Sequence, residues 1–266
     1  MTDQETKQSS ENAASDKQFP IWTTSVTRER QKRYHWGCDV ATDVFGDLVD
    51  VSILSNDCGR SLVKAGLPLD GVVLTYHKID QVKPVMIGDK LEIHGRIQGI
   101  SRDRNGFILT TVFDFLRDGT RVVGMETIAL PGEALLMRKN RVGFEDKTEC
   151  AGWPSEYDLV SRKLMTPEKA RGYAAEVSNK IHFDPGFAAN FGFRAPVTHR
   201  LMEVTSMLGV LAKKGLPDSY EIDCRFSLPL YWDDGMDVVA KDNGDALEFT
   251  CVNARGLLIS EAEFRG

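Results

Sequence analysis

The segment from Asn179 to Asp184 carries side chains that could transfer protons. It reads Asn-Lys-Ile-His-Phe-Asp, so the imidazole of His182 lies between a carboxamide and a carboxylate in the sequence. A histidine exchanges a proton near neutral pH, and a neighbouring carboxylate can orient its ring. We therefore expect acid–base chemistry at His182. Asp184 either orients that ring or serves as a turn or N-cap residue before Pro185.

A long buried helix is predicted soon after this segment. Its apolar residues recur at steps of three and four and form one stripe: Leu201, Val204, Leu208 and Leu211. We expect Thr198 to be the N-cap of this helix, and Gly215 and Pro217 to end it. Backbone N–H groups at a helix N-terminus can stabilise developing negative charge, so the start of this helix is also suited to catalysis.

The two halves of the chain repeat one pattern. Lys-Ala-Gly-Leu-Pro at residues 64–68 matches Lys-Lys-Gly-Leu-Pro at residues 213–217. Strand-like runs at 91–98, 107–115 and 245–252 follow these two segments. A sheet with one apolar face must bury that face. Each half is therefore expected to wrap a curved antiparallel sheet around one long helix, which is an α+β architecture.

The repeat suggests four parts of the chain. Residues 1–20 are polar and read as a disordered tail, and residues 21–131 form the N-terminal unit. Residues 132–158, rich in Glu, Lys, Gly and Pro, are a linker, and residues 159–266 form the C-terminal unit. A shorter helix from Thr166 to Ser178 is expected near the start of this second unit, with Thr166 as its cap.

Composition argues against several classes of protein. The 266 residues carry a net charge of −6 and the pI is about 5.5, which disfavours nucleic-acid binding. No apolar run reaches the roughly 18 residues of a membrane span, and the scattered cysteines fit a reducing cytoplasm. Motifs for nucleotide binding and spacings for metal ligation are missing from the sequence, so we expect no metal and no other resident cofactor.

Three segments of the second half follow one another with few gaps: residues 179–184, Gly192-Phe193, and Ala195 to His199. In this order they resemble the MaoC-like (R)-specific hydratase/dehydratase family. In that family an aspartate and a histidine share the catalytic water, and a backbone N–H group at the start of the central helix holds the thioester carbonyl. The resemblance implies a substrate that is a thioester of coenzyme A or of an acyl carrier protein.

The same resemblance implies roles for the matching residues. His182 becomes the acid/base, and Asn179 shapes the loop that carries it. The backbone from Thr198 to Arg200 becomes the site that holds the thioester carbonyl. His199, at the start of the helix, could also line the tunnel for the acyl chain.

Three positions depart from the MaoC-like pattern. Val177 stands at the catalytic aspartate, Lys180 at a proline and Arg200 at the glycine that starts the helix. Valine cannot accept or donate a proton, so a carboxylate must come from elsewhere, with Asp184 and Asp39 as candidates. Lys180 could pair with a second carboxylate on the substrate.

The first half resembles another family that handles acyl thioesters. Trp36 to Ala41, the helix from Asn56 to Leu62, and Ala65 to Pro68 resemble the 4-hydroxybenzoyl-CoA thioesterase-like family. The resemblance puts Asp39 at the catalytic aspartate, where it could activate water or attack the thioester. A solvated acidic loop is the alternative for Asp39. Together, the two resemblances imply a double hotdog fold.

The expected function is therefore that of an (R)-type enoyl-CoA hydratase or 3-hydroxyacyl-thioester dehydratase. Two alternatives stay open: an acyl-CoA thioesterase that uses Asp39, and a catalytically inactive acyl-binding partner subunit. We expect a cytoplasmic protein that binds neither nucleic acid nor membranes. A homodimer is compatible with the resemblance.

Overall fold

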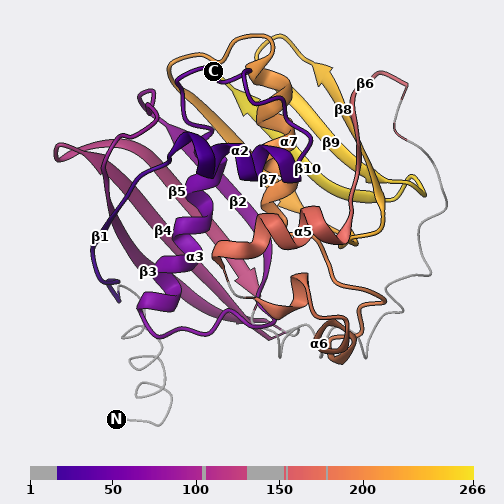
Figure 1. Cartoon of the computed structure of the whole chain (residues 1–266), viewed down its shortest axis with the longest axis horizontal. Coiled ribbons are helices and arrows are strands. Elements are labelled where there is room, and N and C mark those ends of the chain that lie inside the picture. Colours follow the sequence, from indigo (N-terminus) through magenta and orange to yellow (C-terminus); the bar gives the residue numbers. More distant parts are fainter. Residues whose placement is uncertain (1–16, 104–105, 131–152, 154, 178) are drawn as a thin grey trace.

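The computed structural model describes residues 17–103, 106–130, 153, 155–177 and 179–266. In this part of the chain, ten strands form one antiparallel sheet that curves around two helices (Figure 1). The order of its strands is β1-β3-β4-β5-β2-β7-β10-β9-β8-β6. Five strands from each half of the sequence therefore lie together on either side of the β2–β7 pair.

The first half of the chain supplies three helical segments and five strands. The helical segments are α2 (Arg28–Gly37), the 3-10 turn η1 (Val51–Leu54) and α3 (Ser55–Lys64). The strands are β1 (Trp22–Thr24), β2 (Val73–Gln81), β3 (Leu91–Asp103), β4 (Gly106–Arg117) and β5 (Thr120–Leu130).

The second half supplies the remaining elements. Its helical segments are α5 (Pro167–Tyr173), η2 (Ala174–Glu176), η3 (Lys180–His182), α6 (Pro185–Asn190) and α7 (Leu201–Ala212). Its strands are β6 (Asp158–Leu164), β7 (Tyr220–Phe226), β8 (Gly235–Asp242), β9 (Leu247–Asn253) and β10 (Leu258–Arg265).

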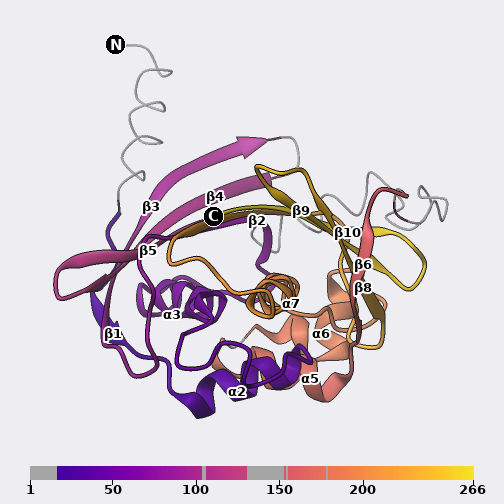
Figure 2. The same ribbon diagram turned by 90° about the horizontal axis from the view of Figure 1, so that it is seen from above.

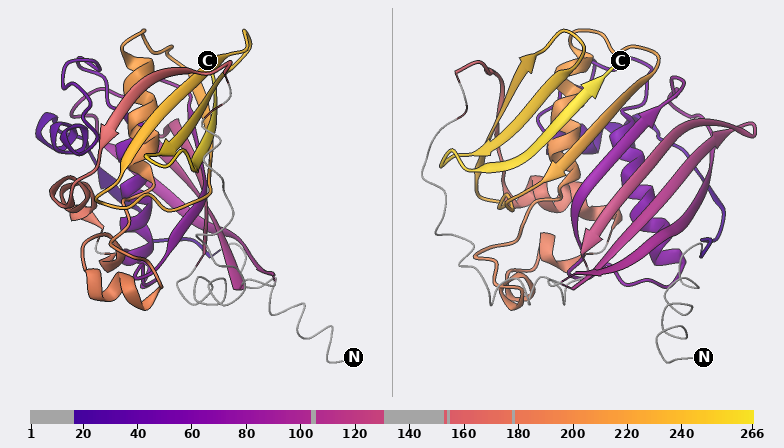
Figure 3. Two further views of the ribbon diagram at one scale, coloured as in Figure 1. Left: turned by 90° about the vertical axis from the view of Figure 1, so that its right-hand side faces the viewer. Right: turned by 180° about the vertical axis from the view of Figure 1, so that it is seen from behind.

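The two central helices, α3 and α7, lie side by side on the inner face of the sheet (Figure 2). The helices α2, α5 and α6 form a further layer on the other side of these two. From behind, the strands of both halves lie in front of the helices (Figure 3). Each half is thus a sheet wrapped on one helix, as the repeat predicted.

Strands β2 and β7 join the two sheets into one. They pair antiparallel, with Ile79 opposite Ile222. Both of these isoleucines are buried, so the apolar core continues across the join. Side chains reinforce the pairing, because the Tyr76 hydroxyl donates to Asp223 Oδ2 at 2.7 Å. The sheet and the apolar core therefore continue from one half to the other.

The ends of the two central helices confirm the repeat in the sequence. α3 ends at Lys64 and α7 ends at Ala212, and each is followed within a few residues by a glycine with a left-handed backbone. Gly66 has a φ of 77° and Gly215 has a φ of 93°. These are conformations that residues with a Cβ adopt rarely.

Glycine also allows each central helix to be crossed closely by the opposite half. A Cβ added at Gly59 of α3 would lie 3.3 Å from Val177 Cγ1, in the segment after α5. A Cβ added at Gly209 of α7 would lie 2.7 Å from Val40 Cγ2, in the segment after α2. Each half therefore packs its own short segment against the helix of the other half.

Some expected boundaries were wrong. Thr198 does not cap α7, because its hydroxyl donates to Leu230 O and the helix begins at Leu201. The helix expected to reach residue 178 ends at Tyr173 and passes into the turn η2, after which Val177 is extended. Thr166 does cap α5, by accepting a hydrogen bond from Lys169 N.

The described chain begins within the expected tail. Phe19 N donates to Gly95 O at 2.8 Å, and the Phe19 ring packs against Phe113. A Cβ at Gly95 would lie 2.8 Å from the Phe19 ring, so this glycine makes room for it. Residues 17–20 therefore extend the first sheet. Residues 1–16 and most of the expected linker lie outside the described residues.

Candidate active site

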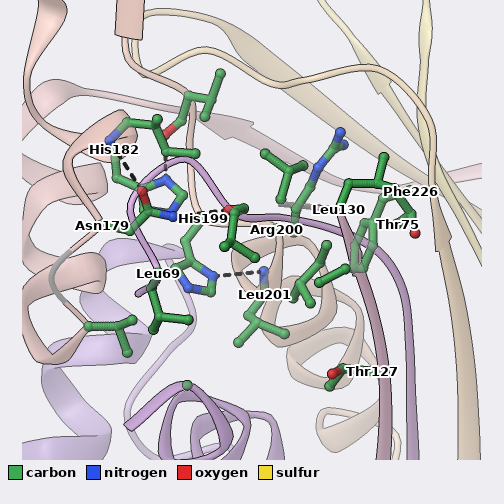
Figure 4. Close-up of a pocket in the computed structure, with 18 of the residues that line it drawn as sticks. Leu69, Thr75, Thr127, Leu130, Asn179, His182, His199, Arg200, Leu201 and Phe226 are labelled. Carbon is green, nitrogen blue, oxygen red and sulfur yellow. Dashed lines mark hydrogen bonds between the residues drawn. The ribbon is translucent and has the colours of Figure 1, made fainter. Parts of the chain in front are cut away.

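A cavity of about 640 Å³ lies between the two halves of the molecule (Figure 4). The first half lines it with α3 and with inward-facing residues of β2, β4 and β5. The second half lines it with the segment from Val177 to Leu201 and with the start of the loop after β7. Both central helices thus reach the cavity. Most of the lining is apolar, with a few polar groups supplied by each half.

His182 presents one free ring nitrogen to this cavity. Its Nδ1 lies 2.9 Å from Val197 O, which can only accept, so Nδ1 carries the ring proton. Nε2 of the neutral ring then has a lone pair and can act as a base. Burial, aided by the positive charge of Arg200, lowers the pKa of His182 to about 4. The imidazole is therefore neutral at neutral pH.

Asn179 fastens the His182 loop to the first half of the chain. Its Oδ1 accepts hydrogen bonds from Gly71 N at 3.0 Å and from Ile181 N at 3.4 Å. Its Nδ2 donates to Val72 O at 3.0 Å. Because these bonds use both ends of the carboxamide, Asn179 positions the loop and takes no direct part in proton transfer.

The start of α7 presents backbone donors beside His182. The N–H groups of His199 and Arg200 find no acceptor among the described residues. The next N–H group, of Leu201, donates to Nδ1 of His199 at 3.3 Å. An N-terminal turn with unsatisfied donors at a cavity can bind a carbonyl oxygen that becomes negatively charged.

The side chain of Arg200 points away from the two histidines (Figure 4). Its guanidinium donates to Ser227 O and Leu228 O and lies over the ring of Phe226. It therefore braces the loop after β7. The nearest carboxylate is that of Glu203, at 3.9 Å. Burial raises the pKa of Glu203 to about 7, which leaves Arg200 only partly neutralised.

Thr198 lines the cavity, but its N–H group donates to Leu230 O at 2.8 Å and is not available to a carbonyl. Asp184 and Lys180 lie outside the cavity lining. Of the two roles expected for Asp184, the N-cap role is confirmed and the orientation of His182 is wrong, because Asp184 caps α6 and accepts a hydrogen bond from Phe187 N. Lys180 lies on the surface, 3.8 Å from Asp70. A carbonyl, not a carboxylate, orients His182.

Asp39 also lies away from the cavity. Its backbone is left-handed, with a φ of 49°. Its carboxylate pairs with Lys169 Nζ at 2.7 Å, in the layer formed by α2 and α5. The acidic residue of the thioesterase hypothesis thus sits on the other side of the central helices.

Val177, which the sequence resemblance matches to the aspartate of the MaoC-like family, lines the cavity. It is buried and packs against Gly59 of α3. The preceding residue, Glu176, turns outward and pairs with Arg30 and Arg33. Arg30 also donates to Asp57 of α3 at 2.9 Å. This ion-pair cluster ties the segment before His182 to the first half.

Sequence reasoning missed the polar residues that the first half supplies to the cavity, among which His77 carries a titratable side chain. His77 of β2 lines the cavity, and its Nε2 lies 2.7 Å from Ser55 Oγ of α3. Burial lowers the pKa of His77 to about 4. The alternation of buried residues along β2, at His77, Ile79 and Gln81, is a signal that could have indicated this inward orientation.

The fold and this cavity define a double hotdog protein. No family model matches the chain. A curated relative, 3-hydroxyacyl-thioester dehydratase X of Mycobacterium tuberculosis, is 22% identical over 170 residues, which are 60% of this chain. The match spans 56% of that relative, little more than half its length.

Solved structures support the same fold over nearly the whole chain. A crystal structure of HtdX from Mycobacterium tuberculosis superposes with a TM-score of 0.74 and 18% identity, covering 93% of this chain and 100% of that one. A MaoC-like dehydratase from Phytophthora capsici gives 0.66 and 16%, covering 95% and 96%. An acyl-ACP thioesterase from Bacteroides thetaiotaomicron gives 0.57 and 9%, covering 93% and 97%. The predicted double hotdog fold is thus confirmed.

Proposed function

We propose that this chain is an (R)-type acyl-thioester hydro-lyase, which hydrates enoyl thioesters or, in reverse, dehydrates 3-hydroxyacyl thioesters. One arrangement carries the proposal: the unprotonated Nε2 of His182 faces a cavity beside the unsatisfied N–H groups of His199 and Arg200. The similarity to proteins named as dehydratases supports this proposal. A thioesterase centred on Asp39 has less support, since Asp39 is paired outside the cavity.

In the proposed hydration, the N–H groups at the start of α7 and the imidazole of His182 carry out different steps. The N–H groups at the start of α7 bind the thioester carbonyl, whose oxygen becomes negative as water attacks the β-carbon. His182 accepts the proton of that water at Nε2. Val197 O stabilises the imidazolium that forms, because it accepts from Nδ1. The proton then passes to the α-carbon, which completes the addition.

The other residues that line the cavity would determine where the substrate binds. The apolar chamber between α3 and strands β2, β4 and β5 would take the acyl chain. We propose no resident cofactor for this chemistry. The cytoplasmic location and the homodimer remain predictions from the sequence. No helix within the described residues is long and apolar enough to span a membrane.

The test uses the purified full-length chain with a short enoyl-CoA, followed for enoyl absorbance and free thiol in one cuvette. We expect absorbance to fall without release of thiol. Release of thiol would instead favour a thioesterase. Neither signal across several chain lengths would contradict both enzymes and favour the inactive acyl-binding subunit.

A further inference from the structure

Two histidines meet at the cavity with opposite hydrogen-bonding character. The rings of His182 and His199 have centroids 4.8 Å apart and are tilted by 31° (Figure 4). Nδ1 of His182 faces a carbonyl, so it must donate. Nδ1 of His199 faces the N–H group of Leu201, so it must accept. In the neutral rings, Nε2 of His182 is therefore an acceptor and Nε2 of His199 is a donor.

Both Nε2 atoms remain available to a molecule in the cavity. Within the described residues, no hydrogen bond uses either atom, and neither is sealed off from a molecule the size of water. His77 differs, because its Nε2 is already bonded to Ser55 and its Nδ1 is sealed. Of the three cavity histidines, only His182 and His199 can bind a further partner through the ring.

The cavity offers no carboxylate to take the place of the missing aspartate. Among the described residues that line it there is neither an aspartate nor a glutamate. Glu176 is held by Arg30, Asp184 caps α6, and Asp39 is paired with Lys169. Among the described residues of the lining, the group that could take the place of the aspartate is therefore not a carboxylate.

We propose that His199 is a second catalytic residue, whose Nε2–H group holds the water that Nε2 of His182 deprotonates. This inference rests on the proposed hydro-lyase function. The water would donate one proton to His182 and accept the hydrogen bond of His199 at its oxygen. The second water proton stays on the oxygen that becomes the hydroxyl group of the product.

The proton balance of the reaction closes with this pair. As the water oxygen bonds to the β-carbon, its proton moves to Nε2 of His182, and the π electrons move to the thioester oxygen held by α7. The enolate electrons then form a C–H bond at the α-carbon with the proton from His182. His199 keeps its own proton throughout. One water is added across the double bond, and both imidazoles return to their starting state.

The surroundings keep both rings uncharged. Burial and the neighbouring His182 and His77 lower the pKa of His199 well below its usual value. The charged or titratable groups facing the pair are His77 from β2, Tyr173 at the end of α5, and Arg200 from the start of α7. None of these supplies a negative charge near neutral pH. The pair is thus a neutral acceptor and a neutral donor.

Two substitutions of His199 and one control substitution distinguish a catalytic role of His199 from a structural role. In His199→Asn the carboxamide oxygen can still accept from Leu201 N–H, but the Nε2 donor is lost. We expect kcat to fall about 100-fold, with KM changed less than threefold and thermal unfolding unchanged. In His199→Gln the amide N–H can reach the Nε2 position, so we expect kcat within about tenfold of wild type. His94→Gln, on the surface, is the matched control.

The results that would contradict a catalytic role of His199 differ from those that would contradict the hydro-lyase function. If His199→Asn keeps the wild-type kcat while His182→Gln loses it, His199 is not catalytic but the hydro-lyase function stands. The same conclusion follows if the Asn and Gln variants lose kcat equally, because the donor then makes no difference. If the wild-type chain hydrates no enoyl-CoA, both proposals fail.

Discussion

The two central helices are copies of one element, yet they begin in different ways. α3 continues directly from the 3-10 turn η1, where the Ser52 N–H group donates to the buried carboxylate of Asp50 and the Ile53 N–H group to Asp50 O. α7 begins at a cavity, and the N–H groups of His199 and Arg200 have no acceptor among the described residues. The first N–H groups before α3 are therefore hydrogen-bonded within the protein, whereas those before α7 are left without an acceptor among the described residues.

This difference assigns separate tasks to the halves. The first half contributes the body of α3 and the inner faces of three strands, which line the chamber proposed for the acyl chain. The second half contributes donors at a helix start and two imidazoles with free Nε2 atoms. Substitutions in the second half should change the chemical step, whereas those in the first should change which chain is accepted.

The strongest test of this division is His182→Gln. We expect kcat for enoyl-CoA hydration to fall about 10³-fold with KM nearly unchanged, because the base is lost while the chamber stays intact. Steady-state kinetics beside the exposed control His94→Gln would measure this. A KM effect as large as the kcat effect would show that the two halves do not divide the work in this way.

Acidification tests the burial of imidazoles from both halves. His77 and His182 have folded pKa values near 4, while the unfolded value is about 6.5. Between these values the unfolded chain binds more protons, so the free energy of unfolding must fall as pH falls. We expect a loss on the order of a few kcal/mol in total between pH 6.5 and 4, from urea unfolding. His77→Gln should flatten this dependence, and an unchanged slope would contradict its burial as a neutral group.

The acyl chamber can be narrowed without touching the chemistry. Ala129 of β5 faces the cavity from the first half, on the side of the strand opposite Ile128. In Ala129→Leu we expect kcat/KM for long-chain enoyl-CoA to fall about 10- to 30-fold, with a four-carbon substrate little affected. Ile128→Leu is the matched control. Equal losses for both chain lengths would mean that the chain lies elsewhere.

The smallest expected effect concerns the missing carboxylate. In the His199→Asn background, Val177→Asp should raise kcat about tenfold, because a carboxylate can hold the water that His199 no longer binds. A negative charge near His182 also raises its pKa. The acid limb of the kcat/KM profile should therefore move upward from about pH 4. A double variant no faster than His199→Asn would indicate that position 177 does not reach the water.

The sequence predicted the fold better than the site. The Lys-x-Gly-Leu-Pro repeat and the strand alternation express local physics, namely a left-handed helix end and a half-buried sheet, and both are present. His182 and Asn179 were found because they lie in one contiguous loop. Their partners were not found, because Val197 O beside His182 and Gly71 N and Val72 O beside Asn179 are backbone atoms, which no side-chain motif reports.

Carboxylates were where sequence reasoning erred. Asp184 and Asp39 were considered because the chemistry requires a charged partner, but Asp184 is used within its own segment and Asp39 is paired with a residue of the other half. Asp184 caps a helix and Asp39 pairs with Lys169. Whether a short acidic side chain is consumed by its own turn depends on backbone geometry that the residue type does not specify.

The crossed packing of Val40 on Gly209 and of Val177 on Gly59 has a consequence for how such a molecule can change over time. In a symmetric dimer of identical chains, every substitution alters two equivalent places at once. Here the two crossing points are encoded by different parts of one sequence. A substitution can therefore change one of them and leave the other unaltered. One crossing point now adjoins an imidazole pair at a cavity, and the other lies beside an ion pair between Asp39 and Lys169. Joining two copies in one chain is what permits such inequality.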